Sequence, residues 1–301
     1  MPRTRIVMAA VLLAWTAACA GCGKRDTAGP SLDAQYRQAM TEPDLAARAS
    51  RLLVVANKQN QAGDLLGMER TLDSATDAAQ QVDNAQGKAL TLNRVAEALG
   101  RAGRTVDAKN LLRSVSKTAD QIAEAEIKVM VLTRMASVYG QQLNSQEIAT
   151  SYLKNCEGIA AEIPRPESQI DALLEIAVTY HALAVAERAT ELFEQSLAAA
   201  RNLEDGRKRA DTVANAAAAL SRMKRADEAH AAFQEAEKLA AQIADAMSRA
   251  YACLHLSDQL RASGRRGDAQ RVLQLAEAAA DKVTDASMRV PLLETIDRSR
   301  R

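Results

Sequence analysis

Aromatic residues are nearly absent from this chain. Its 301 residues include two Phe, one Trp and five Tyr, together 3% of the sequence, whereas 48% of all residues are apolar in the wider sense. A buried interior must therefore be filled by Ala, Leu, Val, Ile and Met, which suits closely packed helices and suits strands poorly. The composition predicts an all-α protein.

Motifs that would bring catalytic groups together are also missing. The three histidines, His181, His230 and His255, fall at unlike positions, whereas catalysis and metal binding need convergent groups. No His-x-x-x-His, no Gly-rich phosphate loop and no Cys-x-x-Cys beyond residue 22 occurs. We therefore expect no enzymatic activity, no cofactor and no metal site.

Long blocks of one charge sign are lacking as well. The formal net charge is +1, and the 39 basic and 38 acidic residues are interspersed along the chain. Neither a basic block nor basic residues alternating with aromatic ones occur, as a nucleic-acid groove would require. We therefore expect no nucleic-acid partner.

Only the first 22 residues contain a long uncharged stretch. Arg3 and Arg5 precede residues 6–20, which carry no charge and are too few to span a membrane convincingly. This pattern predicts a secretory signal peptide over residues 1–21. Its alternative outcomes are cleavage at a small-residue site, which would leave a soluble periplasmic protein, and retention as an uncut anchor.

The end of this segment resembles a bacterial lipobox. Ala20 and Gly21 directly precede Cys22, although Cys19 stands where the lipobox usually has Leu. The resemblance implies lipidation of Cys22, with Cys19 as the alternative, and a membrane anchor in the bacterial cell envelope that faces the periplasm. The residue after Cys22 is Gly23 rather than the Asp associated with inner-membrane retention in some bacteria, which favours the outer membrane.

From residue 44 onward, one pattern of apolar and small residues recurs about every forty residues. Within each unit the apolar spacing is helical and is broken once in the middle and once at the end, so each unit is predicted to be a helix hairpin. In the second helix a small residue precedes a large one by one turn, as in Ala108 and Leu112. The first core positions of the six units are Leu52, Leu92, Leu132, Leu173, Val213 and Cys253.

Acidic and basic residues recur at the start of the first helices. The acidic or amide positions should cap free amides, and the bases four residues later are interpreted as solvated or inter-repeat ion pairs rather than as an anion-binding ladder. The capping positions are Asn84, Asp205, Asp245 and Asp285, the bases that follow them are Lys88, Arg209, Arg249 and Arg289, and Glu124 with Lys128 forms a fifth pair.

The pattern resembles the tetratricopeptide repeat. The residues Leu92, Val95, Ala96, Leu99, Ala108 and Leu112 match its signature spacing, but the period is about forty rather than thirty-four residues. The resemblance implies a right-handed α-α solenoid of about six TPR-like helix hairpins. The expected organisation is a tether over residues 22–42, six repeats over 43–286, and a C-terminal capping helix over 287–301 with Glu294, Asp297 and Arg298 on its polar face.

In this family the first helices line a concave groove that binds a protein or peptide partner. The Lys and Asn set that clamps a C-terminal carboxylate in some members is not reproduced, and a partner with a central apolar stretch would suit the groove. Equally, Leu174, Val178 and Leu254 could be core residues of a repeat with altered geometry. The positions that the resemblance assigns to the groove are Asn57, Asn93, Glu97, Thr133, Ser137, Leu174, Val178, Ala214, Ala218, Leu254 and Asp258.

Taken together, these patterns predict a non-enzymatic interaction scaffold that is anchored by lipid in the cell envelope. The alternatives are a ligand-sensing or cell-wall-associated solenoid in the periplasm, soluble if the signal is cut without lipidation. Cys156 and Cys253 belong to repeats that are too far apart for a disulfide, and both are predicted to be free and buried.

Overall fold

The computed structural model describes residues 30–300, which form fourteen helices and no strand. The predicted signal peptide and both candidate lipidation sites lie outside the described residues. The helices are α1 (Leu32–Met40), α2 (Leu45–Gln61), α3 (Leu65–Gln80), α4 (Ala85–Arg101), α5 (Thr105–Ala119), α6 (Ala125–Gln141), α7 (Gln146–Ala160), α8 (Pro166–Ala182), α9 (Ala186–Arg201), α10 (Gly206–Arg222), α11 (Ala226–Gln242), α12 (Ala246–Ala262), α13 (Arg266–Ala280) and α14 (Ala286–Arg300).

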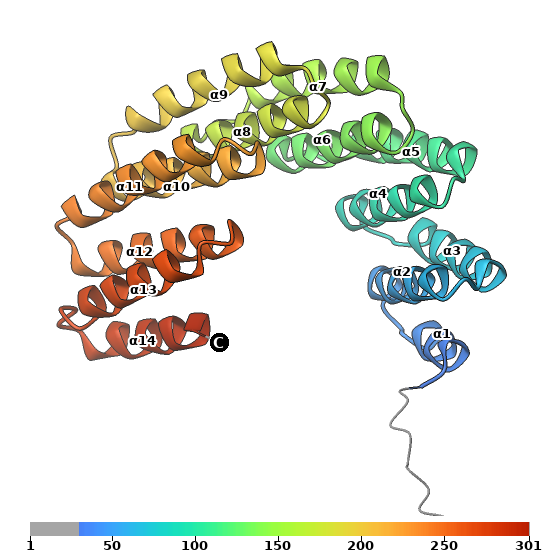
Figure 1. Cartoon of the computed structure of the whole chain (residues 1–301), viewed down its shortest axis with the longest axis horizontal. Coiled ribbons are helices and arrows are strands. Elements are labelled where there is room, and N and C mark those ends of the chain that lie inside the picture. The colour runs from blue at the N-terminus through green and yellow to red at the C-terminus, as the bar shows by residue number, and fades with distance from the viewer. Residues whose placement is uncertain (1–29, 301) are drawn as a thin grey trace, which may run out of the picture.

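Helices α2 to α13 form six antiparallel hairpins stacked side by side, with α1 before the first and α14 after the last (Figure 1). The first helix of each hairpin contacts the first helices of its neighbours, whereas the second helices contact few residues of one another. Closer packing on one side than on the other bends the stack into an arch with the first helices on its inner side. The prediction of an all-α solenoid of TPR-like helix hairpins is confirmed.

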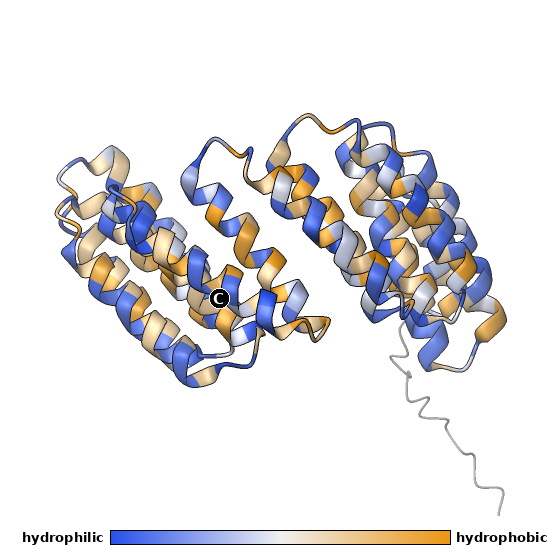
Figure 2. Ribbon diagram, turned by 90° about the horizontal axis from the view of Figure 1, so that it is seen from above, coloured by the Kyte–Doolittle hydropathy of each residue, from blue (hydrophilic) through white to orange (hydrophobic). Residues whose placement is uncertain are grey.

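The core follows the small and large columns of the repeat. Leu92, Ala96 and Leu99 of α4 are buried against Ala108 and Leu112 of α5. Alanine at the crossing lets the two helix backbones approach, and leucine fills the space beside it. Figure 2 shows apolar and polar residues alternating along the helices, as expected when each helix packs on its neighbours and also meets solvent.

Each hairpin turns through one residue with a positive φ angle. Gly63, Gly103 and Gly264 have φ between 77° and 79°, whereas the same position is Asn144, Ala184 or Lys224 in the other hairpins. In five of these hairpins the amide that follows donates back to the helix carbonyl five residues earlier, for example from Val185 to Tyr180 at 2.9 Å, and after Asn144 the amide of Ser145 donates to Tyr139, six residues earlier. This bonding closes the first helix with a left-handed C-terminal cap.

The connection from one hairpin to the next is capped as predicted. The side chains of Asn84, Asp205 and Asp245 accept the amide hydrogens of Gly87, Lys208 and Ser248 at 2.6, 2.9 and 2.7 Å. Asp285 accepts the amide of Ser287 at 2.8 Å. These bonds satisfy amides that the first turn of a helix leaves free.

Among the bases of this column, the predicted inter-repeat ion pair forms at Lys128. Across residues 30–300, no ion pair joins any of these bases to the acid or amide four residues earlier, and Lys128 lies 3.5 Å from Asp120 instead. Arg249 donates its Nε to the carbonyl of Ile243 at 2.7 Å, and Arg48, which the sequence analysis missed, donates in the same way to Glu42. Arg249 and Arg289 thus bind carbonyls that end the preceding hairpin, where a cation is favoured.

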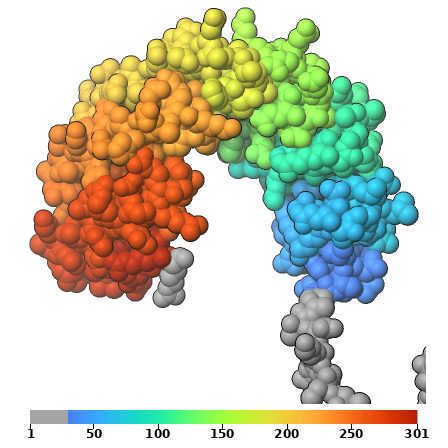
Figure 3. Space-filling view, viewed as in Figure 1, coloured from blue at the N-terminus to red at the C-terminus, as the bar shows by residue number. Residues whose placement is uncertain are grey.

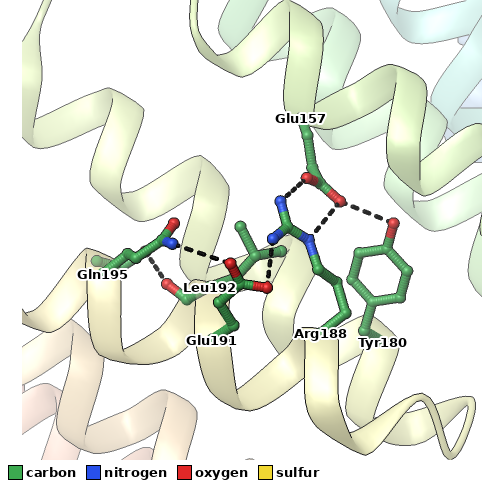
Figure 4. Close-up of polar contacts among 7 residues, drawn as sticks. Glu157, Tyr180, Arg188, Glu191, Leu192 and Gln195 are labelled. Carbon is green, nitrogen blue, oxygen red and sulfur yellow. Dashed lines mark hydrogen bonds and ion pairs between the residues drawn. The ribbon is translucent and has the colours of Figure 1, made fainter.

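Polar contacts also join hairpins through the second helices. Glu157 of α7 accepts the hydroxyl of Tyr180 from α8 at 2.8 Å and pairs with Arg188 of α9 (Figure 4). Arg188 reaches Glu191 of its own helix at 2.6 Å. Burial and the neighbouring Glu157 carboxylate raise the pKa of Tyr180, so the phenol stays protonated and donates to that carboxylate.

The ends of the stack are covered by α1 and α14. Tyr36 of α1 lies 3.0 Å from the hydroxyl of Ser74, and α1 occupies residues that the sequence analysis assigned to the tether. In α14, Leu292 and Ile296 are buried and Glu294, Asp297 and Arg298 are exposed. Cys156 and Cys253 are free and buried, as predicted.

Candidate interaction surface

The inner side of the arch is a continuous hollow, visible in the space-filling view (Figure 3). Its walls are the first helices, each of which turns residues at spacings of three, four and seven toward the hollow. The position two residues after the first core position recurs on this wall in every hairpin, and we call these residues the inner column. The inner column consists of Val54, Arg94, Arg134, Glu175, Asn215 and His255.

Members of the inner column bond across neighbouring first helices. Arg94 donates to the hydroxyl of Ser50 at 2.7 Å, so α4 is joined to α2. On the other half of the arch, Asn215 donates to Asp171 at 2.9 Å, and its amide oxygen lies 2.8 Å from Nε2 of His255. The inner column therefore changes along the arch from Val through two Arg to Glu, Asn and His, on a scaffold whose packing is repeated.

The structure separates the eleven predicted groove residues into two sets. Six are accessible on the inner wall or half-buried there, and five are buried between helices. The accessible set is Asn57, Glu97, Ser137, Val178, Ala218 and Asp258, and the buried set is Asn93, Thr133, Leu174, Ala214 and Leu254.

The buried set corrects the predicted surface by a rotation of about one residue. Asn93 is completely buried and donates to the backbone carbonyl of Val131 in α6 at 2.9 Å. A turn of 100° per residue therefore places Asn93 against the next hairpin and Arg94 on the open wall. Leu174 and Leu254 follow the core alternative, although Leu174 also reaches the floor of a cleft.

A cleft of about 540 Å³ opens in the first half of the arch, between α2, α4 and α6. Leu53 and Val54 contribute apolar surface, and Glu97 lies between the guanidinium groups of Arg101 and Arg134 and pairs with both. The charged side chains that line this cleft are Lys58, Arg94, Glu97, Arg101 and Arg134.

A second cleft of about 600 Å³ lies in the other half, between α8, α10 and α12. Glu175 and Arg222 form a two-bonded ion pair across it, at 2.6 and 2.8 Å. Burial raises the pKa of Asp171, against the opposing effects of the Asn215 hydrogen bond and of His255. Burial likewise raises the pKa of the neighbouring Asp211. Carboxylates kept away from water in this way interact strongly with any cation that enters the cleft.

The described residues contain no group of three or more His, Cys, Asp or Glu side chains arranged to hold a metal ion. Over the same residues, 30–300, no helix combines the length and the apolar character needed to cross a bilayer. The sequence analysis missed Arg94, Arg134, Asn215 and His255, although their common offset from the first core position was available as a signal.

No protein-family model and no curated protein matches this chain. Among solved structures, it is similar to Ton1535 from Thermococcus onnurineus NA1, with 12% identity over 87% of this chain and 94% of that one and a TM-score of 0.42. It is also similar to the nearly identical TPR-like repeats of a putative kinesin light chain from Podosopora anserina, with 21% identity over 68% and 100% and a TM-score of 0.36.

A third similar structure is a Rap protein complexed with Competence and Sporulation Factor, with 14% identity, coverage of 88% of this chain and 78% of that chain, and a TM-score of 0.36. Identities and TM-scores are low in all three comparisons. The fold therefore rests on the packing of this chain's own helices.

Proposed function

We propose that this protein is a non-enzymatic scaffold that binds a polypeptide partner along the inner side of its arch and is anchored by lipid in the bacterial cell envelope. One observation carries the binding proposal. The positions that pack the hairpins repeat the same residue types, while the inner column changes from apolar to basic to acidic to amide and imidazole. Uniform packing positions keep the hairpins in a regular stack, and the varied residues of the inner column can then contact different side chains of an extended partner.

Binding is tested by photo-crosslinking in the native bacterium. A crosslinkable amino acid at Ser137, which is half-buried on the inner wall, should capture a protein partner. The matched control is the same substitution at Arg113, which is exposed on α5 at the outer side. Equal capture from the two positions would contradict binding along the inner side.

The anchoring proposal rests on the sequence alone. The basic lead of Arg3 and Arg5, the uncharged stretch and the cysteine stop coincide in residues 1–22, and acyl chains on Cys22 would hold the body at a membrane, with the outer membrane favoured. Palmitate label should enter the wild-type protein and be lost in Cys22→Ser, or in Cys19→Ser if that site is used. Continued labelling of a variant that lacks both cysteines would refute the anchor.

A further inference from the structure

The two clefts of the inner side differ in charge although the chain is nearly neutral overall. The cleft between α2, α4 and α6 is lined by four basic side chains and one acidic side chain. The cleft between α8, α10 and α12 is lined by Asp171 and Glu175 against a single base, Arg222, and the carboxyl of Asp211 lies close to Asp171. The hollow is therefore electrically polarised along its length.

Ion pairing inside the first cleft leaves positive charge unbalanced. Glu97, whose side chain is only 15% exposed, already pairs with both Arg101 and Arg134. Arg94 forms its side-chain hydrogen bond with the neutral hydroxyl of Ser50, and Lys58 forms its own with the neutral amide of Gln35 at 2.7 Å. One carboxylate thus serves two guanidinium groups, while Arg94 and Lys58 face the cleft and no carboxylate of residues 30–300 is bound to them.

From this charge and shape we infer that the first cleft binds an acidic polypeptide segment of the partner. The inference rests on the proposed function, because it specifies which part of a partner enters the hollow and where. Carboxylates of the segment would form a two-bonded contact with Arg94 and would also bind Lys58 and Arg134, whose bond to Glu97 uses one nitrogen. Apolar side chains between them would contact Leu53 and Val54, which is 56% exposed. Neighbouring first helices lie roughly 10 Å apart, so α2 to α6 accommodates about six extended residues.

A polypeptide fits this cleft better than the other polyanions do. The described residues that line the cleft include no aromatic side chain on which a base could stack. An anionic membrane is nearly flat and would not reach basic groups inside a concave wall. The carboxylates of the second cleft repel the same acidic segment, which restricts it to the first three hairpins.

The probe is a fluorescent peptide of about ten residues with Glu at alternate positions and Ala or Leu between them, compared with analogues that carry Gln or Lys instead. Measured by fluorescence anisotropy on the whole chain, the Glu peptide should bind more tightly than the Gln peptide. Its affinity should fall as salt is added, and the Lys peptide should bind least. The double variant Arg94→Gln, Arg134→Gln should weaken binding of the Glu peptide about tenfold or more.

The matched control is Lys109→Gln with Arg113→Gln on the exposed side of α5, which removes the same charge without touching either cleft. Affinity should stay within about twofold of the wild type, and circular dichroism should show that both double variants are folded. Equal weakening by the control would reduce the effect to net charge and would overturn the inference. Tighter binding of oligothymidine or of anionic phospholipid vesicles than of the Glu peptide, lost in the Arg94 and Arg134 variant, would also overturn it.

Failure of the inference can be separated from failure of the proposed function. If the Ser137 crosslink captures a protein partner equally in the wild type and in the Arg94 and Arg134 variant, the inferred acidic segment is wrong and the scaffold proposal stands. If Ser137 captures no more than the outer control and no peptide binds, both are wrong.

Discussion

At the residue scale, the hairpin turns show where sequence and backbone conformation disagree. Ala184 and Lys224 both have a φ of 60°, a conformation in which the side chain crowds the following carbonyl, whereas glycine adopts it freely. Ala184→Gly and Lys224→Gly should each raise the free energy of unfolding by about 1 kcal/mol. Denaturant unfolding followed by circular dichroism measures the change.

Gly264 provides the matched control for these two substitutions. It has a φ of 78°, and a methyl group added there would meet no atom within 4 Å, so Gly264→Ala changes backbone strain alone. We expect this variant to lose about 1 kcal/mol. A gain of stability on Gly264→Ala, or a loss on Ala184→Gly, would show that the positive φ angle of these turns does not strain a non-glycine residue.

Burial of Asp171 disfavours the ionised form of its carboxyl group in the folded protein. Because burial raises its pKa, the folded protein retains the Asp171 proton at pH values where the unfolded chain has released it. The unfolded state then binds fewer protons, so stability falls as the pH rises through the folded pKa. Asp171→Asn abolishes this loss and can still accept the Asn215 hydrogen bond.

We therefore expect Asp171→Asn to unfold at a higher temperature than the wild type at pH 7, by an amount that shrinks as the pH approaches 3.8, the ordinary value for an aspartate. Thermal unfolding of the two proteins across this range measures the difference. Glu175→Gln is the control, because Glu175 is exposed and already paired with Arg222. A difference that grows toward acid pH would contradict a raised pKa at Asp171.

At the scale of elements, the hairpin connections depend on arginines that bind backbone carbonyls. Arg249 donates to the carbonyls of Ile243 and Ala244, where α11 ends and α12 begins. Arg249→Met keeps the apolar stem and removes both donors, so it should destabilise the protein by about 1 to 3 kcal/mol. Urea unfolding measures the loss.

The control for Arg249→Met is Arg266→Met, because Arg266 is exposed at the start of α13 and its side chain forms no hydrogen bond within residues 30–300. We expect this change to stay within about 0.5 kcal/mol of the wild type. If the two variants lost the same stability, the carbonyl contacts of Arg249 would contribute nothing specific.

The elements were predictable from the sequence because packing constrains them directly. Two helices can cross closely only where a small residue such as Ala96 or Ala108 recurs, and a hairpin can close only where the helical spacing breaks, as at Gly63 or Gly103. These constraints act within forty residues. They fixed the helix hairpins and the capping aspartates without any knowledge of how one hairpin stacks on the next.

The inner surface was less predictable because it depends on that stacking. A rotation of about one residue moved Asn93 into the interface with α6 and brought Arg94 to the open wall. Likewise, Arg249 has an acid one turn before it, but its guanidinium donates to carbonyls at the end of the preceding hairpin. Contacts between repeats decide both cases, and a pattern read within one repeat does not contain them.

At the scale of the whole molecule, each hairpin is stabilised by the hairpins next to it. Each hairpin contacts the hairpin on either side, and the helix pairs of residues 30–300 that pack extensively all belong to the same hairpin or to adjacent ones. The solenoid should therefore lose structure from an end inward, with each hairpin's stability set by its own packing and by its two interfaces. An arch with this property can open at one end while the rest of its inner surface stays formed.

Leu292→Ala tests this directly. Leu292 is one of the two buried residues, with Ile296, that hold α14 against the last hairpin, and its truncation should cost about 2 to 5 kcal/mol locally. Hydrogen exchange measured by mass spectrometry should become faster in α12 to α14 and stay unchanged in α2 to α5, which share no interface with the altered helix. Met135→Ala, at a buried position of the central helix α6, should instead accelerate exchange in the hairpins on both sides of it. Faster exchange throughout the chain on Leu292→Ala would mean that the arch unfolds as one cooperative unit. A change at one end would then destabilise both of the oppositely charged clefts together.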